Sequence, residues 1–482
     1  MQIKNIILLI PIIFLGQNFE SNLPIISINT HGNDILDDPR IIADMGIISN
    51  LNNNNKLSDN FNNYNGKISI EIRGSSSQDL FPKKSYSIET QTIDGENNNV
   101  SLVQLPEEND WVLYGAYSDK TLFRNNLAYE LSRQMGYYSP RTKHCELFIN
   151  NVYQGVYILT EKIKRDKNRV DIKKIDGNDL SGGYIIKIDK LTDAPINASW
   201  CSNFTTFNNN LVCFQYHYPK ADDITVEQKN YIEIFMNSVY NSIKELSDSQ
   251  LSIDFIDNIN FESFVDYLII SELSKNVDAY RISTFLYKDS DEINGKLNMG
   301  PVWDYNLSFG NVDFCKSSEI NGWVFDEETA CNGSVPIYWA DLLKNDSFRN
   351  KLSDRWFELR SNTLRIENIF NHIDSVSQHI SAAQTRNFEK WNILDEYIWP
   401  NYQLAESYED EINFLKYWIY HRAKWIDDNI NDIRLIFPDC SSQEKKLLNK
   451  INVIGKSSEI TNNKIFFNIY DNGCVEKNLI TY

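Results

Sequence analysis

The stretch LNMGPVWDYNLSFGN, residues 297–311, places a carboxylate where the packing of apolar side chains does not require one. Gly300 and Pro301 come shortly before Trp303 and Asp304, so the charge falls where the chain is expected to turn. Aspartates are almost never fully buried unless they are paired or bound to a cation. Asp304 is therefore a candidate metal or catalytic residue, and the alternative is a loop aspartate that caps a helix.

A second carboxylate occupies a similar position in NVDAYRISTFLYKD, residues 276–289. Asp278 follows the helical segment 261–275 and precedes an apolar strand, so it can converge with Asp304 from a neighbouring turn. Phosphoryl transfer uses one aspartate to orient the attacking hydroxyl and another to hold magnesium. A glycosidase would need the same two carboxylates, and two unrelated surface turns remain a further alternative.

The segment RGSSSQDLFPKKSY, residues 73–86, joins two predicted strands, 67–73 and 85–90. Backbone amides in a turn rich in glycine and serine, with hydroxyl and ammonium groups nearby, suit a polyphosphate. Extending the strand alternation backwards predicts that Lys84, rather than Lys83, points into a cleft. The alternative is a surface hairpin with a solvated lysine pair.

The chain has 482 residues, of which 42% are hydrophobic and 13% aromatic, enough for a large core and about two to four domains. Its net charge of −19 gives no basic footprint for a duplex, so we expect no nucleic-acid partner. Nucleophilic hydrolysis is not supported, because no histidine lies next to a GxSxG turn. The three histidines beside apolar or aromatic residues are typical of packed side chains: His144, His217 and His421.

Residues 1–17 combine an early lysine with an apolar run too short to span a bilayer, which predicts a secretory signal peptide rather than a buried helix. No later stretch is long and apolar enough for a membrane helix. The seven cysteines predict two loop disulfides, Cys201 with Cys213 and Cys315 with Cys331. Of the remaining Cys145, Cys440 and Cys474, at least one must be a free thiol, and no spacing indicates zinc.

The order of predicted elements indicates an α+β protein. Alternating strand patterns fill residues 23–218, which we expect to form a β-rich N-terminal lobe. Helical periodicity dominates residues 219–438, which we expect to form a helical C-terminal lobe with a cleft between the two. Residues 445–482 carry short strands of their own and form a small β tail.

Six segments in this order resemble the CotH kinase family, named for a bacterial spore-coat protein kinase. The similarity runs from about residue 68 to residue 311 and continues through the helices to about residue 437. The matching segments are RGSSSQDLFPKKSY, NDWVLYGAYSDKTLFRNNLAYEL (109–131), CELFINNVYQGVYILTEKI (145–163), GGYIIKID (182–189), NVDAYRISTFLYKD and GPVWDYNLSFGN.

The resemblance implies an atypical, protein-kinase-like two-lobed fold that transfers phosphate from ATP to serine or threonine of a protein, with Mg²⁺. By motif, Asp278 resembles the catalytic aspartate, and Asp304 with Asn306 the metal site. Lys84 resembles the lysine that contacts phosphate, with Arg73 and Ser75 of the preceding turn also contacting ATP. Glu161 is a weaker candidate for the partner of that lysine.

The chain departs from the family pattern at two positions. Asn306 stands where members often have a second aspartate, and Ser283 stands where a kinase-like catalytic loop would have asparagine. Both keep an oxygen ligand, but Asn306 lowers the negative charge, so a second metal would bind less tightly. An alternative function is therefore a non-catalytic adhesion or binding protein with a kinase-like fold, and processing of polysaccharide is a third.

The C-terminal segment resembles the sorting domain of proteins exported by the type IX secretion system, on the strength of its VIG turn and its IYDNGCVEK sequence. This resemblance implies a secreted or cell-surface protein whose partner is the secretion machinery, whereas the kinase resemblance implies a protein substrate rich in serine and threonine. The alternative is a small β appendage packed on the helical lobe.

Overall fold

The fold is known from a computed structural model. It describes residues 19–175, 179–192, 195, 197–326 and 331–435, and the strands 447–452, 465–470 and 475–479. The expected signal peptide, Cys440, Cys474 and most of the C-terminal tail lie outside the described residues. Within the described residues, no helix combines the length and apolar character needed to cross a membrane.

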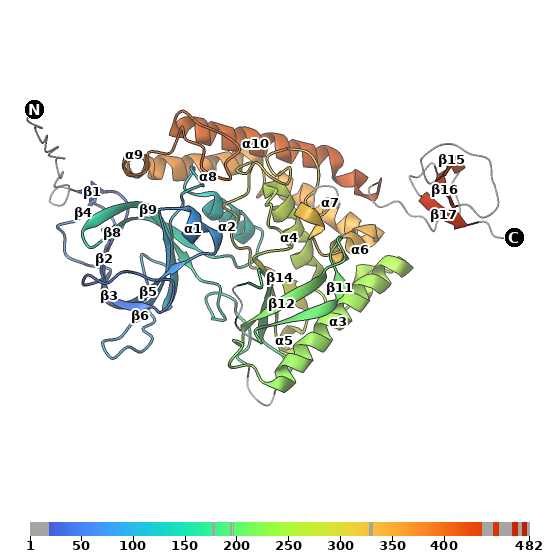
Figure 1. Ribbon diagram of the computed structural model, residues 1–482, viewed down its shortest axis with the longest axis horizontal. Coiled ribbons are helices and arrows are strands. Elements are labelled where there is room, and N and C mark those ends of the chain that lie inside the picture. Colours follow the sequence, from blue (N-terminus) through green and yellow to red (C-terminus); the bar gives the residue numbers. More distant parts are fainter. Residues whose placement is uncertain are drawn as a thin grey trace, which may run out of the picture.

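A closed β-barrel forms the N-terminal part of the molecule (Figure 1). Its strands, in order around the barrel, are β2 (Ile25–Asn29), β3 (Ile41–Ile48), β5 (Tyr64–Arg73), β6 (Ser85–Gln91), β7 (Asp110–Tyr114), β9 (Val152–Glu161) and β8 (Thr142–Ile149). The alternation predicted for residues 67–73 is confirmed, because Ile68 and Ile70 are fully buried in the barrel core. The parallel pairing of β2 with β8 closes the ring.

A second, antiparallel sheet follows the barrel. Its strand order is β11 (Ser199–Thr205), β12 (Leu211–Tyr218), β10 (Tyr184–Ile188), β13 (Thr284–Lys288) and β14 (Leu297–Met299). The Cys201–Cys213 disulfide joins directly opposed residues of β11 and β12, as predicted. Because β13 pairs with β10, this sheet takes strands from both sides of the lobe boundary expected between residues 218 and 219.

The helices cover the second sheet and one side of the barrel. Their bounds are α2 (Arg124–Gln134), α3 (Val226–Ser249), α4 (Phe261–Ser274), α6 (Tyr338–Lys344), α7 (Asp346–Ser361), α8 (Ile366–His379), α9 (Ser381–Lys390) and α10 (Tyr408–Asn429). The helical periodicity read from the sequence is confirmed in each region. Helix α3 begins at a capping box in which Thr225 and Gln228 exchange side-chain and backbone hydrogen bonds.

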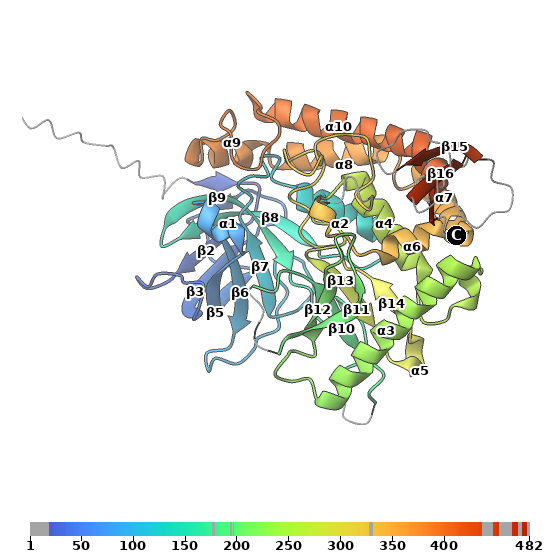
Figure 2. The same cartoon turned by 45° about the vertical axis from the view of Figure 1, so that its right-hand side comes forward.

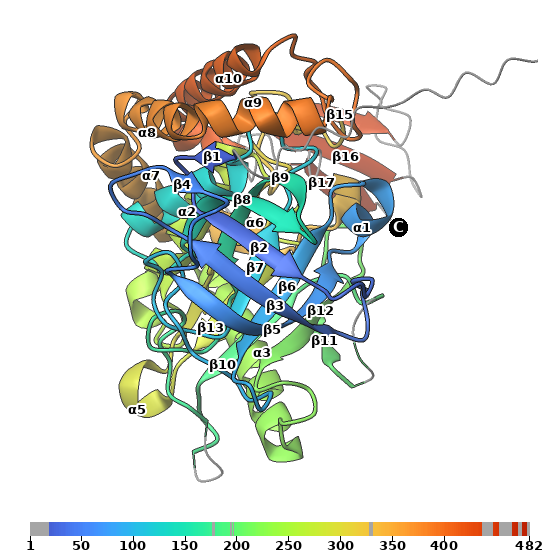
Figure 3. The ribbon, with the colours of Figure 1, turned by 90° about the vertical axis from the view of Figure 1, so that its left-hand side faces the viewer.

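Helix α4 forms the centre of the helical part. Every residue of α4 except Glu262 is buried, as expected for a helix that is apolar on nearly all sides. In Figure 2 the second sheet lies between the barrel and α3. Figure 3 shows the molecule from the barrel side, with α9 and α10 above the barrel strands.

Short elements complete the fold. They are β1 (Glu20–Ser21), which pairs with β4 (Asn55–Lys56), the one-turn helices α1 (Ser76–Leu80) and α5 (Asp291–Asn294), and the tail sheet of β15 (Leu447–Asn452), β16 (Ile465–Tyr470) and β17 (Val475–Leu479). The chain is thus a mixed α and β structure, as the sequence predicts. It is organised around a barrel and an open sheet.

Candidate active site

A cleft of about 690 Å³ opens between the barrel and the second sheet. The barrel lines it with side chains from β7 and from the end of β9, together with the turn between β5 and β6. The second sheet lines it with alternate residues of β12 and with β10 and β13. Asp278 and Asp304 both line this cleft, so the structure brings together the two carboxylates that the sequence singled out.

Asp304 is presented to the cleft by an unusual backbone turn. Its φ angle of 63° lies in the left-handed region, which aspartate tolerates better than most residues. The amide of Asp304 donates to the hydroxyl of Tyr129 at 3.1 Å, and the ring of Trp303 stacks on Tyr129 with centroids 6.1 Å apart. Because Tyr129 is almost fully buried in α2, the turn is anchored to a rigid helix.

The electrostatic surroundings of Asp304 make its ionisation less favourable than that of an aspartate in water. Although its side chain reaches solvent, the cleft walls displace much of the surrounding water, and this desolvation raises the pKa of Asp304 to about 6. The charge of Asp278 raises this pKa further, whereas the Arg73 guanidinium lowers it. A carboxylate that is disfavoured in this way gains most from a bound cation.

Asp278 belongs to the turn that connects α4 to β13. Its Oδ1 accepts a charge-assisted hydrogen bond from Arg281 Nη2 at 2.5 Å. Burial raises the pKa of Asp278, against the lowering effects of Arg281 and Lys190. Asp278 thus combines proton affinity with a fixed orientation, which are the properties a base in the cleft requires.

Asn306 also lines the cleft, and its backbone carbonyl accepts from Asn311 Nδ2 at 2.8 Å. Among the residues that the structure describes, no group of three or more histidine, cysteine, aspartate or glutamate side chains is arranged to hold a metal. Magnesium is usually bound by one or two carboxylates and completed by water and substrate phosphates. The mutually repelling Asp278 and Asp304, with the amide of Asn306, fit such a site.

The lysine expected to contact phosphate is misassigned. Lys84 Nζ donates to the carbonyls of Phe81, at 2.7 Å, and Gln78, at the end of α1, and Lys84 is not part of the cleft lining. Lys83 lines the cleft instead. The expectation failed because it chose the wrong face of the alternation: Lys83 and Ser85 line the cleft, whereas Tyr86 and Ile88, on the face predicted for Lys84, pack in the barrel core.

Lys83 does not take over the expected role. Its ammonium donates to the carbonyls of Ala116 at 3.1 Å and Val156 at 2.7 Å, and to Asn387 Oδ1 at 2.8 Å. All three ammonium hydrogens therefore have protein acceptors, and the side chain is only 2% exposed. Lys83 joins the barrel to α9.

Glu161 is buried and pairs with an arginine, so the expectation that it pairs with a lysine is wrong. Arg141 Nε donates to the Glu161 carboxylate at 2.9 and 3.0 Å, and the Arg141 amide donates at 2.9 Å. The next residue, Lys162, lines the cleft. Neighbouring residues at the end of a strand point to opposite sides, which explains why Glu161 faces away.

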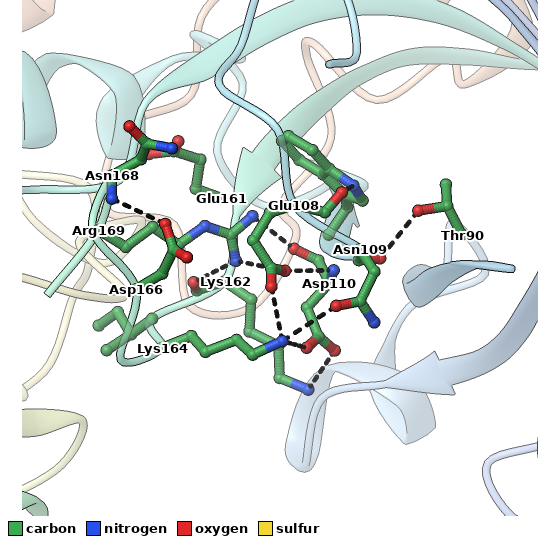
Figure 4. A network of polar contacts seen from close by, with 12 residues as sticks. Thr90, Glu108, Asn109, Asp110, Glu161, Lys162, Lys164, Asp166, Asn168 and Arg169 are labelled. Atoms are coloured by element: carbon green, nitrogen blue, oxygen red, sulfur yellow. Dashed lines mark hydrogen bonds and ion pairs between the residues drawn. The ribbon is translucent and has the colours of Figure 1, made fainter. Parts of the chain in front are cut away.

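Lys162 stands at the edge of a polar network beside the start of β7 and the end of β9 (Figure 4). Its ammonium lies 3.6 Å from Asp110 Oδ1, whereas Lys164 contacts both Asp110 Oδ2 and Glu108 Oε1 at 2.6 Å. Arg169 supports the same network from its buried side, through a contact of 3.4 Å with Glu108. Lys162 therefore has a long contact with a carboxylate that is already paired.

The second sheet contributes charged residues that sequence reasoning missed. Lys187 Nζ contacts Asp189 Oδ2 at 2.7 Å, and Lys190 Nζ donates to the Ser76 hydroxyl at 3.2 Å across the cleft. Asp189 ends the quoted segment GGYIIKID and Lys190 follows it, and charges directly after an apolar strand were the available signal. Arg73 and Ser75 lie where they were expected, in the cleft lining.

Aromatic side chains surround the outer part of the cleft. Phe314 and Trp399 stack with centroids 6.0 Å apart and nearly parallel planes. Opposite them, Phe81 packs on Tyr117 at 5.3 Å. Phe314 precedes Cys315, whose predicted disulfide to Cys331 is present. The cleft thus has charged walls inside and an aromatic rim outside.

Comparison with known proteins agrees with the sequence resemblance. A family model described as CotH kinase protein matches residues 70–426. A crystal structure of a Helicobacter pylori proinflammatory kinase, CtkA, aligns with 10% identity over 72% of this chain and 94% of that chain, with a TM-score of 0.29. No curated protein matches the sequence.

Proposed function

The chain belongs to the CotH kinase family, and from that premise we propose that it transfers the γ-phosphate of ATP to a serine or threonine hydroxyl of a protein substrate. The observation that carries the proposal is the meeting of Asp278 and Asp304 in one cleft, where the charge of Asp278 disfavours ionisation of Asp304. Cationic side chains line the same cleft and face these carboxylates. Carboxylates and cations together are what a phosphate-metal complex requires.

In the proposed reaction, Asp278 orients the acceptor hydroxyl and takes its proton. The hydroxyl oxygen forms a bond to the γ-phosphorus while the bond to the bridging oxygen of ADP breaks, and ADP leaves with that electron pair. The ion pair with Arg281 keeps the Asp278 carboxylate in place throughout. The raised pKa of Asp278 suits it to receive a proton.

Five side chains would hold the phosphates and the metal. Arg73, Ser75 and Lys162 would contact phosphate oxygens, and Lys162 replaces Lys84 in the role first expected. Asp304 and Asn306 would hold Mg²⁺, which when bound neutralises charge that develops on the phosphates. The long contact of Lys162 with Asp110 leaves its ammonium free to turn toward a ligand.

We place this activity outside the cell. The expected signal peptide, the expected type IX sorting tail and the two disulfides support that location. The substrate would then be a secreted or cell-surface protein rich in serine and threonine.

A phosphotransfer assay tests the function. The purified protein is incubated with Mg²⁺, ATP and a serine-rich acceptor protein, and phosphate incorporation is read by mass spectrometry. Asp278→Asn and Asp304→Asn should each lower transfer by at least about 100-fold. Asp354→Asn, on the exposed side of α7, is the matched control and should retain full transfer. Transfer that survives both cleft substitutions would contradict the proposal.

One observation favours a non-catalytic binding protein as the second candidate. Within the described residues no three acidic side chains of the cleft are arranged to hold a metal, and Asn306 and Ser283 carry no charge. Such a protein would still bind Mg²⁺ and ATP, with a rise in melting temperature that depends on ligand concentration. Thermal stabilisation by Mg²⁺ and ATP with no phosphate transfer to any serine-rich protein would favour it.

A further inference from the structure

The cleft has one closed end and one open end. At the closed end, Ile163 is 3% exposed and Phe285 is 5% exposed, and His217 lies half-buried beside them. At the open end, Trp399 is 49% exposed and Leu80 is 52% exposed. Apolar side chains beside an aromatic ring that carries hydrogen-bonding nitrogens suit a flat heterocycle.

The charged residues are ordered between these two ends. Lys187 and Lys162 act electrostatically on His217, and both lower its pKa. The pKa of Asp304 is instead affected by Asp278 and Arg73, and also by Asp189 and Lys190. A nucleotide whose base enters the closed end would therefore lay its phosphates over the lysines and reach the carboxylates. The reverse orientation would put the γ-phosphate at the closed end, where no protein acceptor could reach it.

His217 presents a defined hydrogen-bonding face. Its Nε2 lies 2.9 Å from the Ile163 carbonyl, and its ring meets Phe285 edge-on with centroids 5.1 Å apart. Burial lowers the pKa of His217 to about 4, so the ring is neutral at pH 7. A neutral ring that donates through Nε2 has no hydrogen on Nδ1, which is then an acceptor.

We propose that the closed end of the cleft takes the purine base of the nucleotide and that His217 selects adenine over guanine. This inference rests on the function proposed above. Adenine has an exocyclic amino group that can donate to Nδ1, whereas guanine has a carbonyl oxygen at the same ring position. Two acceptors would then face each other, and a buried acceptor without a donor discriminates strongly against the wrong ligand.

Binding measurements with three probes test the inference. Titration calorimetry in Mg²⁺ compares the β,γ-imido analogues of ATP and GTP with inorganic tripolyphosphate, which has no base. The wild-type protein should prefer the ATP analogue by about tenfold or more. His217→Phe should bring that preference close to one and leave tripolyphosphate binding unchanged. His217→Asn, which keeps a donor and an acceptor, should restore part of the preference.

His144 supplies a matched control. Its Nε2 lies 3.0 Å from the Leu122 carbonyl, and burial lowers its pKa to about 4, as for His217. His144 does not line the cleft. His144→Phe should therefore lower the melting temperature and leave the preference for the ATP analogue intact.

Equal binding of the two analogues by the wild-type protein would overturn the inference, and so would an unchanged preference in His217→Phe. Loss of the preference in Trp399→Ala would also overturn it, because the base would then lie at the open end. If tripolyphosphate still binds in any of these cases, only this inference fails, and the proposed function is not contradicted. If neither analogue nor tripolyphosphate binds, both proposals fail. Should His217→Phe not fold, His217→Asn and the wild type decide the matter.

Discussion

Lys83 and Lys162 both line the cleft from the barrel side, but different groups surround their ammonium groups. Lys83 is buried and donates to three oxygens within 3.1 Å, one of them on α9. The side chain of Lys162 is 37% exposed, and its nearest carboxylate oxygen, on Asp110, lies 3.6 Å away. The first lysine sits where the barrel meets a helix, and the second where the chain leaves the barrel for the second sheet.

The difference separates cations that build the fold from cations that can bind a ligand. An ammonium whose hydrogens all have buried acceptors can turn to a phosphate only by leaving those acceptors unpaired, which costs about 1–3 kcal/mol for each. Lys162 has no such cost, because Lys164 already pairs with Asp110 at 2.6 Å. Proximity to the cleft therefore does not identify a binding residue, whereas unsatisfied hydrogen-bonding capacity does.

The largest effect is expected at Arg422, which belongs to the same class as Lys83. It is fully buried, contacts Glu272 Oε2 at 3.2 Å and donates to the carbonyls of Ile320 and Gly322. Removing one partner of a buried ion pair leaves an uncompensated charge. Arg422→Met should lower the free energy of unfolding by about 3–5 kcal/mol, measured from urea denaturation. The double variant with Glu272→Gln should recover part of the loss, and a loss below about 1 kcal/mol for Arg422→Met alone would contradict the assignment.

The next largest effect is expected at Lys83. Lys83→Met leaves two carbonyls and the Asn387 side chain without their donor and should lower the free energy of unfolding by about 2–3 kcal/mol. Lys84→Met is the matched control. It removes donors from two carbonyls at the half-exposed end of α1, and urea denaturation should show a loss below about 1 kcal/mol. Equal losses would show that Lys83 does not join the barrel to α9.

The lysine pair also shows where sequence reasoning stops. Period-2 patterns predicted the barrel strands and helical periodicity predicted the helices, because both are local consequences of burying one face. The pattern groups Lys84 with Tyr86 and Ile88, but it does not say which face meets the cleft, and in the fold Tyr86 and Ile88 lie in the barrel core. The acceptors of Lys83 come from residues 116, 156 and 387, which only the folded chain brings together.

The same limit applies to the site. Asp278 and Asp304 could be predicted because a carboxylate among apolar residues needs a reason in any fold. Glu161 could not be assigned, since its partner Arg141 lies on the strand beside it and the sequence gives no sign of that pairing. Lys162, its neighbour, became a candidate only when the cleft showed which side of β9 faces the second sheet.

A smaller effect on stability, but a large one on binding, is expected at Lys162. Lys162→Met should change the free energy of unfolding by less than about 0.5 kcal/mol, because its contact with Asp110 is long and half exposed. It should weaken binding of Mg²⁺ and ATP by about tenfold or more, measured by calorimetry. Lys164→Met is the control from the same network (Figure 4) and should show the opposite pattern, with lower stability and retained binding. If Lys162→Met binds Mg²⁺ and ATP as tightly as the wild type, the assignment of Lys162 to the phosphate site is wrong.

A small effect on stability is also expected at Asp304, and it should have the opposite sign. The pKa of Asp304 rises from 3.8 to about 6 on folding, so the folded protein binds this proton more tightly than the unfolded chain. Stability from this group is therefore present below pH 4 and is lost as the pH rises toward 6. Asp304→Asn removes that loss and should raise the free energy of unfolding at pH 7 by less than about 1 kcal/mol, because the carboxylate reaches solvent, and the melting temperature should rise with it.

The pH dependence of this gain is the decisive measurement. The difference in melting temperature between Asp304→Asn and wild type should disappear as the pH falls from 7 to 4, while phosphotransfer by the variant stays lost at every pH. Asp354→Asn, away from the cleft, should show no such trend. A destabilised Asp304→Asn at pH 7 would place Asp304 with Lys83 among the groups that build the fold. A stabilised but inactive variant would place it with Lys162, because a residue kept at a cost to stability is one kept for its ligand.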